Sequence, residues 1–65
     1  MTLDKARELL QVQVDFGGGY NRNSARLILA EVVREHGQIE ANKLISEMNL
    51  EEVFGFAAVP VQHHI

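Results

Sequence analysis

The stretch of the sequence with the clearest capacity to bind a ligand is GGGYNRNS, residues 17–24, which leads into a predicted helix. Glycines let the backbone approach a ligand closely, and the free N–H groups and positive dipole end of a helix attract an anion. The guanidinium of Arg22 adds a positive charge at the same place. The candidate anion-binding residues are therefore Gly17, Gly18, Gly19, Arg22, Asn23 and Ser24.

The spacing within this stretch matches neither common phosphate-binding motif. It lacks the Gly-Lys-Ser/Thr ending of a P-loop and the G-x-G-x-x-G pattern of dinucleotide-binding folds, and no confidently predicted strand precedes it. A tight turn between two helices, in which glycines adopt positive φ angles, explains the same residues. In either case we expect the Arg22 side chain to matter only to a bound anion and hardly to stability. An anion- or nucleotide-binding module is therefore an alternative function and not the preferred one.

The histidines give no metal-site pattern. His36 stands beside Glu35 at the end of a predicted helix, where a packed ring that interacts with the helix C-terminus is the simpler interpretation. The residue three positions before it is Val33, so the Glu-x-x-His motif of di-iron bundles is absent. His63 and His64 fall in the C-terminal tail, and the sequence has no cysteine. We expect no metal, no disulfide and no cofactor.

Composition and charge argue against catalysis and nucleic-acid binding. No serine, histidine and aspartate cluster or paired-carboxylate spacing stands out, so we expect no enzyme activity. The net charge is −3 and the six basic residues are scattered, unlike the basic patch of a nucleic-acid binder. The first ten residues, MTLDKARELL, contain charges and no long apolar run, which predicts neither a signal peptide nor a membrane span. A cytoplasmic location is the expectation.

A central helix over residues 24–36 would position most of these groups. Asn23 stands where an N-cap belongs, and Gly37 stands where a positive φ angle would end the helix. Between them, apolar residues recur at helical spacing and form one stripe. That stripe comprises Ala25, Ile28, Leu29, Val32, Val33 and His36.

Two further helices are expected on either side of the central one. A helix over residues 3–14 has Thr2 as its cap, although the alternation of apolar and polar residues over 10–16 also fits a strand. The helix is preferred because the only other candidate strand, residues 56–61, is short and interrupted by Pro60. A helix over residues 39–48 presents an apolar stripe that matches the central one.

The chain is expected to finish with a short helical turn over residues 50–54 and an extended tail. Asn49 can end the preceding helix in the left-handed conformation, or it can cap the turn together with Glu52 as a capping box. Residues 1–55 would then form a single small helical domain, and residues 56–65 an extended C-terminal tail.

The helix, glycine and helix around Gly37 also have the order of a helix-turn-helix, so a small DNA-binding protein is a second alternative. The second helix of that motif would enter the major groove. It carries Glu40 and Glu47 against a single Lys43, and carboxylates there repel phosphates. A plain helical hairpin is preferred.

The preferred function is a small, non-catalytic interaction or regulatory module. A chain of 65 residues buries a small core, and without disulfides its spare apolar surface favours self-association. The predicted fold is all-α, a helical hairpin in a dimeric bundle, whose partner is a second copy or another protein. Leu27 lies opposite the main stripe of the central helix, so that helix has two apolar sides. The expected interaction surface is Leu27, Ala30 and Arg34.

Overall fold

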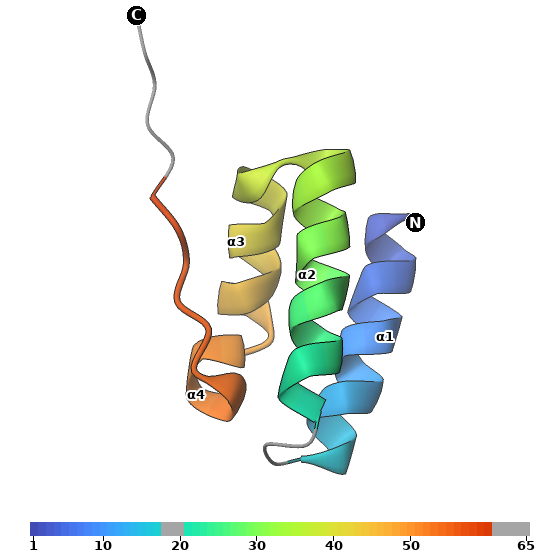
Figure 1. Ribbon diagram of the computed structural model, residues 1–65, viewed down its shortest axis with the longest axis vertical. Coiled ribbons are helices and arrows are strands. Elements are labelled where there is room, and N and C mark those ends of the chain that lie inside the picture. The colour runs from blue at the N-terminus through green and yellow to red at the C-terminus, as the bar shows by residue number, and fades with distance from the viewer. Residues whose placement is uncertain (18–20, 61–65) are drawn as a thin grey trace, which may run out of the picture.

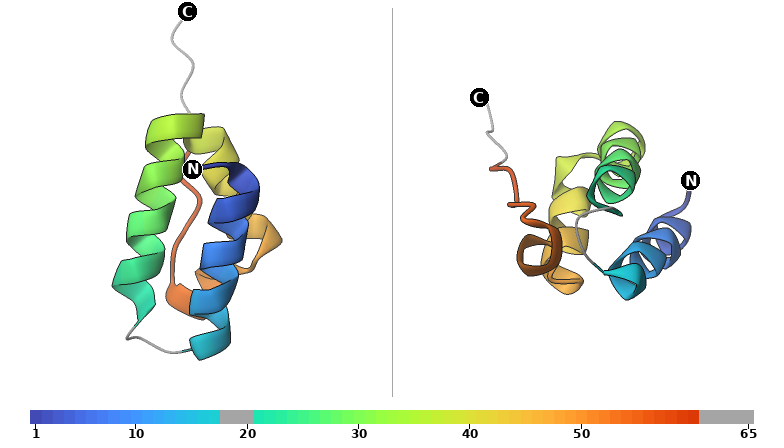
Figure 2. Two further views of the ribbon diagram at one scale, coloured as in Figure 1. Left: turned by 90° about the vertical axis from the view of Figure 1, so that its right-hand side faces the viewer. Right: turned by 60° about the horizontal axis from the view of Figure 1, so that its bottom comes forward.

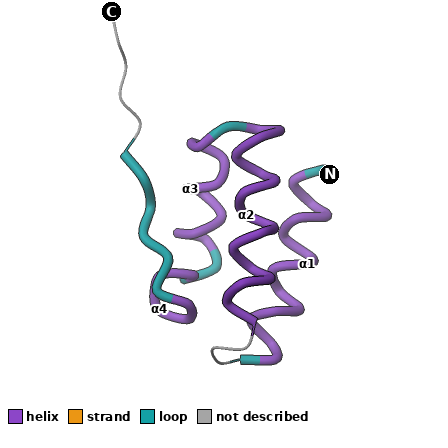
Figure 3. The backbone as a smooth tube through the Cα atoms, in the orientation of Figure 1, coloured by secondary structure: helices purple, strands orange, loops and turns teal. Residues whose placement is uncertain are grey.

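The computed structural model describes residues 1–17 and 21–60. In this part of the chain every regular element is a helix, with no strand (Figure 3). The helices are α1 (Leu3–Phe16), α2 (Arg22–His36), α3 (Gln38–Glu47) and α4 (Leu50–Phe54). The expected all-α fold is confirmed, and residues 10–16 are helical, so the alternative strand is wrong.

The helices α1, α2 and α3 form a bundle, in which α2 stands between α1 and α3 in the view of Figure 1 but not in those of Figure 2. Each runs antiparallel to its neighbour in sequence, and α2 packs against both α1 and α3. The short helix α4 packs against the end of α3, and residues 55–60 then run back along α3 (Figure 1). The expected hairpin is therefore α2 and α3, and α1 packs on α2 and reaches α3 through the ion pair of Arg7 with Glu47.

The caps of α1 follow from local sequence signals. The Thr2 hydroxyl oxygen accepts a hydrogen bond from the Lys5 backbone N–H at 3.0 Å, as expected for an N-cap. The helix continues two residues beyond the expected end at residue 14 and ends at Gly17, whose φ is +68°. Glycine adopts this positive φ without the steric cost that a Cβ imposes, so the helix ends there.

The start of α2 differs from the prediction. The helix begins at Arg22 and not at residue 24, so Asn23 lies in the first turn and the cap position belongs to Asn21. The Asn21 side chain makes no capping hydrogen bond, and the expected Asn23 cap is wrong. Two asparagines two positions apart give nearly the same local signal. The contacts of Arg22 with the C-terminal part of the chain, described below, accompany the earlier start.

The core lies where α2 meets its neighbours. Half of the expected stripe on α2 is buried, namely Ala25, Leu29 and Val32, and Ile28 is partly buried. Val33 is 36% exposed and His36 is also exposed. The stripe is therefore narrower than predicted, because α1 and α3 cover only the part between them. The buried core residues are Ala6, Leu10, Ala25, Leu29, Val32, Ala41, Leu44, Ile45, Leu50 and Phe54.

The turns after α2 and α3 use residues with positive φ. Gly37 has φ +96° and its N–H donates to the Val33 carbonyl at 3.0 Å, which confirms the expected end of α2. The next helix spans 38–47, one residue earlier than predicted. Asn49 adopts the left-handed conformation at φ 54°, but its side chain makes no capping hydrogen bond, so the capping box with Glu52 does not form. The bounds of α4, residues 50–54, are as predicted.

Candidate interaction surface

The outward side of α2 carries the three residues expected to form an interaction surface. Leu27 is 67% exposed, and Ala30 and Arg34 are also exposed. Their spacing of three and four residues places them on one side of the helix. Neither α1 nor α3 covers Leu27. The Arg34 guanidinium pairs with Glu31 of the same helix, so its charge is largely balanced within the chain.

An apolar groove of about 310 Å³ lies beside this surface. It runs between α2, α3 and residues 55–59, and Ala30 belongs both to the groove and to the outward side of α2. Val33 and Val59 line it and remain partly exposed, which leaves apolar side chains facing solvent. Its principal apolar lining residues are Leu29, Ala30, Val33, Ile45, Phe56 and Val59.

One wall of the groove is an extended segment that α3 holds by its side chains. The Asn42 side-chain oxygen accepts from the Val59 N–H at 3.0 Å, and the Asn42 amide donates to the Val59 carbonyl at 2.7 Å. Gln38 donates to the same Asn42 oxygen at 2.9 Å. One asparagine therefore satisfies both backbone groups of Val59, as a neighbouring strand would. The i, i+4 spacing of Gln38 and Asn42 is compatible with their own hydrogen bond but gives no signal of the contact with Val59.

Arg22 holds the other end of the same segment. Its Nε donates to the Phe54 carbonyl at 2.9 Å, and its guanidinium carbon lies 5.0 Å from the centroid of the Phe56 ring. The ring centroids of Phe54 and Phe56 are 5.7 Å apart. This cation–π contact links the first turn of α2 to the residues that follow α4. Sequence reasoning missed this role of Arg22, because its hydrogen bond to Phe54 spans 32 positions of the chain.

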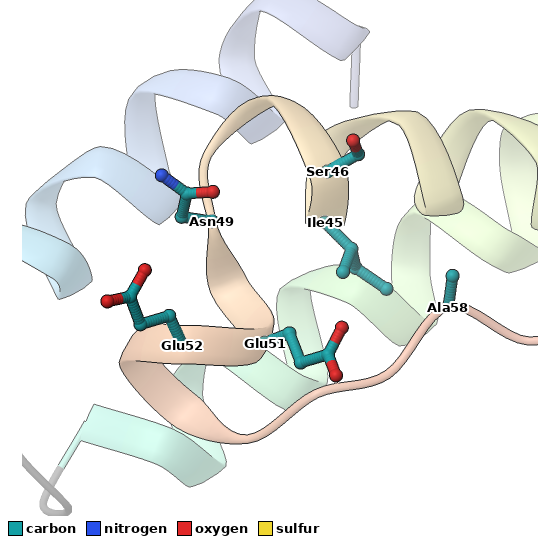
Figure 4. Close-up of a pocket in the computed structure, with 6 residues that line it drawn as sticks. All are labelled: Ile45, Ser46, Asn49, Glu51, Glu52 and Ala58. Carbon is teal, nitrogen blue, oxygen red and sulfur yellow. The ribbon is translucent and has the colours of Figure 1, made fainter.

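A second hollow, of about 660 Å³, has Ala58 in its lining (Figure 4). Ile45 and Ser46 of α3, Asn49, and Glu51 and Glu52 of α4 complete its lining. Figure 4 shows the carboxylates of Glu51 and Glu52 pointing to different parts of the hollow. Both side chains belong to exposed residues, so solvent hydrates them. The hollow therefore presents two separate charges and not a converging ligand set.

The candidate anion-binding residues are only partly placed. Gly18 and Gly19 lie outside the described residues, whereas Gly17 ends α1. Asn23 and Ser24 are exposed in the first turn of α2. Arg22 contacts the C-terminal segment, as above, and this gives its guanidinium a structural partner. Anion binding stays a prediction.

The N-terminus contacts the end of α2. His36 Nε2 lies 2.8 Å from the Met1 carbonyl oxygen, and Glu35 accepts hydrogen bonds from the N-terminal ammonium. The hydrogen bond with the ammonium lowers the pKa of Glu35 below its usual value, although desolvation partly opposes this shift. Within residues 1–17 and 21–60, no group of three or more His, Asp or Glu side chains could hold a metal ion. His63 and His64 fall outside those residues.

Comparison with protein-family models, curated proteins and solved structures gives no match. In the described part of the chain, no helix is both long enough and apolar enough to cross a membrane. Function is therefore inferred from the surface itself.

Proposed function

We propose that this chain is a small, non-catalytic protein–protein interaction module that works as a homodimer through the outward side of α2. The observation that carries the proposal is Leu27, a large apolar side chain that is 67% exposed on a helix already packed on two sides. Burying such a leucine in an interface contributes about 1.5–3 kcal/mol. A dimer also supplies the additional apolar burial that a small single core lacks.

The chemistry of this side of α2 suits a symmetric contact. In an antiparallel pair of α2 helices, Ala30 would lie near the two-fold axis, where its small side chain lets the helices approach closely. Leu27 of one copy would then pack on the aliphatic part of Arg34 of its partner. Because Arg34 already pairs with Glu31, the interface would not bury an unbalanced charge.

The solution mass of three proteins tests this proposal. Light scattering across the micromolar range should give a dimer for the unmodified chain and a monomer of 7.3 kDa for Leu27→Glu. The Leu27→Glu carboxylate would be desolvated in the interface without a partner, at a cost of several kcal/mol. The matched control is Val12→Glu, which makes the same kind of change at another partly exposed helix position, 42% exposed, and should remain a dimer.

A 7.3 kDa monomer for the unmodified chain at all these concentrations would refute the dimer. A Leu27→Glu variant with unchanged mass would place the interface elsewhere. Circular dichroism of each variant at high protein concentration shows whether the monomer folds alone or whether folding and association are one event.

The two alternative functions have less support. The would-be recognition helix α3 has its Lys43 paired with Glu40 at 3.2 Å, and its Glu47 is bonded to Arg7 of α1, so it offers little positive charge to phosphates. DNA binding, like anion binding by residues 17–24, therefore stays an alternative prediction. The cytoplasmic location is likewise a prediction, which a fluorescent fusion can check.

A further inference from the structure

The groove beside α2 combines an apolar lining with one positive charge. Among the described residues that line it, Arg26 is the only charged one, and no carboxylate is present. Gln38 is the other long polar side chain at its edge. The net charge of the chain is −3, so the charge of this groove is opposite in sign to that of the chain as a whole. The groove therefore favours an occupant with apolar side chains and a negative charge.

Arg26 is also the one basic side chain that makes neither an ion pair nor a side-chain hydrogen bond within residues 1–17 and 21–60. Arg22 bonds to the Phe54 carbonyl. The remaining basic residues form ion pairs: Lys5 with Glu8, Arg7 with Asp4 and Glu47, Arg34 with Glu31, and Lys43 with Glu40. A bound carboxylate would give Arg26 the partner that these residues already have.

The size of the groove limits what can enter it. A volume of about 310 Å³ is at the lower end of small-molecule pockets, which span roughly 300–1,000 Å³. The lining residues of α2 run from Arg26 to Val33, about two turns or about 10 Å along the helix axis. A few side chains from one face of a helix would fit this length, with aliphatic residues at positions i and i+4.

We propose that the groove between α2, α3 and residues 55–59 docks an acidic amphipathic helix of another protein, with its aliphatic residues beside Val33 and Ile45 and a carboxylate on Arg26. This inference rests on the proposed role in protein binding but not on the homodimer, because Ala30 is the one lining residue that the groove shares with the outward side of α2. The wall formed by residues 55–59 is fastened to Asn42, so the groove exists before the partner arrives.

A peptide selection experiment tests the chemistry of the occupant and does not require that its identity be known. The probe is a phage-displayed library of randomised helical peptides, selected against the unmodified chain, Arg26→Glu and Lys43→Glu. Lys43→Glu is the matched control, because Lys43 is an exposed basic residue of α3 that lines neither the groove nor the outward side of α2. Circular dichroism confirms that each variant is folded before selection.

The unmodified chain and Lys43→Glu should select peptides with aliphatic residues at i and i+4 and an Asp or Glu one turn away. Arg26→Glu should select Lys or Arg at that position instead, and should bind the original acidic peptides about tenfold more weakly. Amide chemical shifts of Val33, Ile45 and Val59 should move when a selected peptide is added.

Several results would overturn the proposal: failure to select peptides, selected peptides without acidic enrichment, or the same charge switch with Lys43→Glu. A peptide that dissociates the dimer to 7.3 kDa would show that a second copy fills the groove, and this also overturns it. The two proposals fail separately. Failed selection with the dimer mass intact refutes only the groove, whereas a monomer that shows the charge switch refutes only the dimer.

Discussion

At the scale of single residues, Arg22 illustrates how one side chain can take a role that its sequence neighbourhood does not indicate. Beside three glycines it resembles part of an anion site, and its loss would then leave stability nearly unchanged. In the structure its Nε bonds to the Phe54 carbonyl and its guanidinium stacks on Phe56. Both contacts lie within the protein, so the expected effect of its removal changes.

We predict that Arg22→Ala lowers the free energy of unfolding by about 1 kcal/mol, because it removes one hydrogen bond and one cation–π contact at a partly exposed site. Arg22→Lys should recover part of this loss, since an ammonium can still lie over the Phe56 ring. The measurement is the urea midpoint. Arg26→Ala is the control, because Arg26 lacks such contacts within the described residues. Equal midpoints for Arg22→Ala and Arg26→Ala would mean that the Arg22 contacts contribute nothing measurable.

At the scale of elements, α2 has three environments on one helix. One side packs in the core, a second lines the groove, and the outward side carries Leu27. Val32 is fully buried, whereas the next residue, Val33, is 36% exposed and lines the groove. Two identical side chains, adjacent in sequence, therefore separate the contribution of α2 to stability from its contribution to binding.

We predict that Val32→Ala lowers the free energy of unfolding by roughly 1–3 kcal/mol, because it removes buried methyl groups and leaves a cavity. Val33→Ala should cost about 0.5 kcal/mol or less, since solvent already reaches that side chain. Chemical denaturation of both variants measures the difference. If the two losses are equal, the assignment of the buried side of α2 is wrong.

At the scale of the whole molecule, a chain of 65 residues can bury only a small hydrophobic core. A single core of this size supplies only a few kcal/mol of net stability, so association and folding are expected to be linked. The outward side of α2 and the groove beside it are both apolar surfaces that the fold leaves open. Self-association would cover the first, and a partner would cover the second.

We predict that the thermal midpoint of the unmodified chain rises with protein concentration, because dimer formation stabilises only the folded state. Leu27→Glu should have a midpoint that is independent of concentration. Circular dichroism melts over a hundredfold range of concentration would measure both. A constant midpoint for the unmodified chain would contradict the linkage between folding and association.

The sequence by itself determined the features that depend on neighbours within about one helical turn. The Thr2 cap, the helix end at Gly37 and the left-handed Asn49 all follow from the conformations open to those residues. Helical periodicity likewise predicted core positions on α2, such as Leu29 and Val32. These signals depend on neighbouring residues only, so they can be interpreted without knowledge of the rest of the fold.

Only the tertiary structure decided the features that depend on segments distant in sequence. The two ends of the bond between Asn42 and Val59 are 17 positions apart, and those of the bond between Arg22 and Phe54 are 32 apart. Without these bonds the groove would lack its wall, and no local pattern encodes them. The same holds for the exposure of Val33, because a stripe on a helix does not state how much of it the neighbouring helices cover.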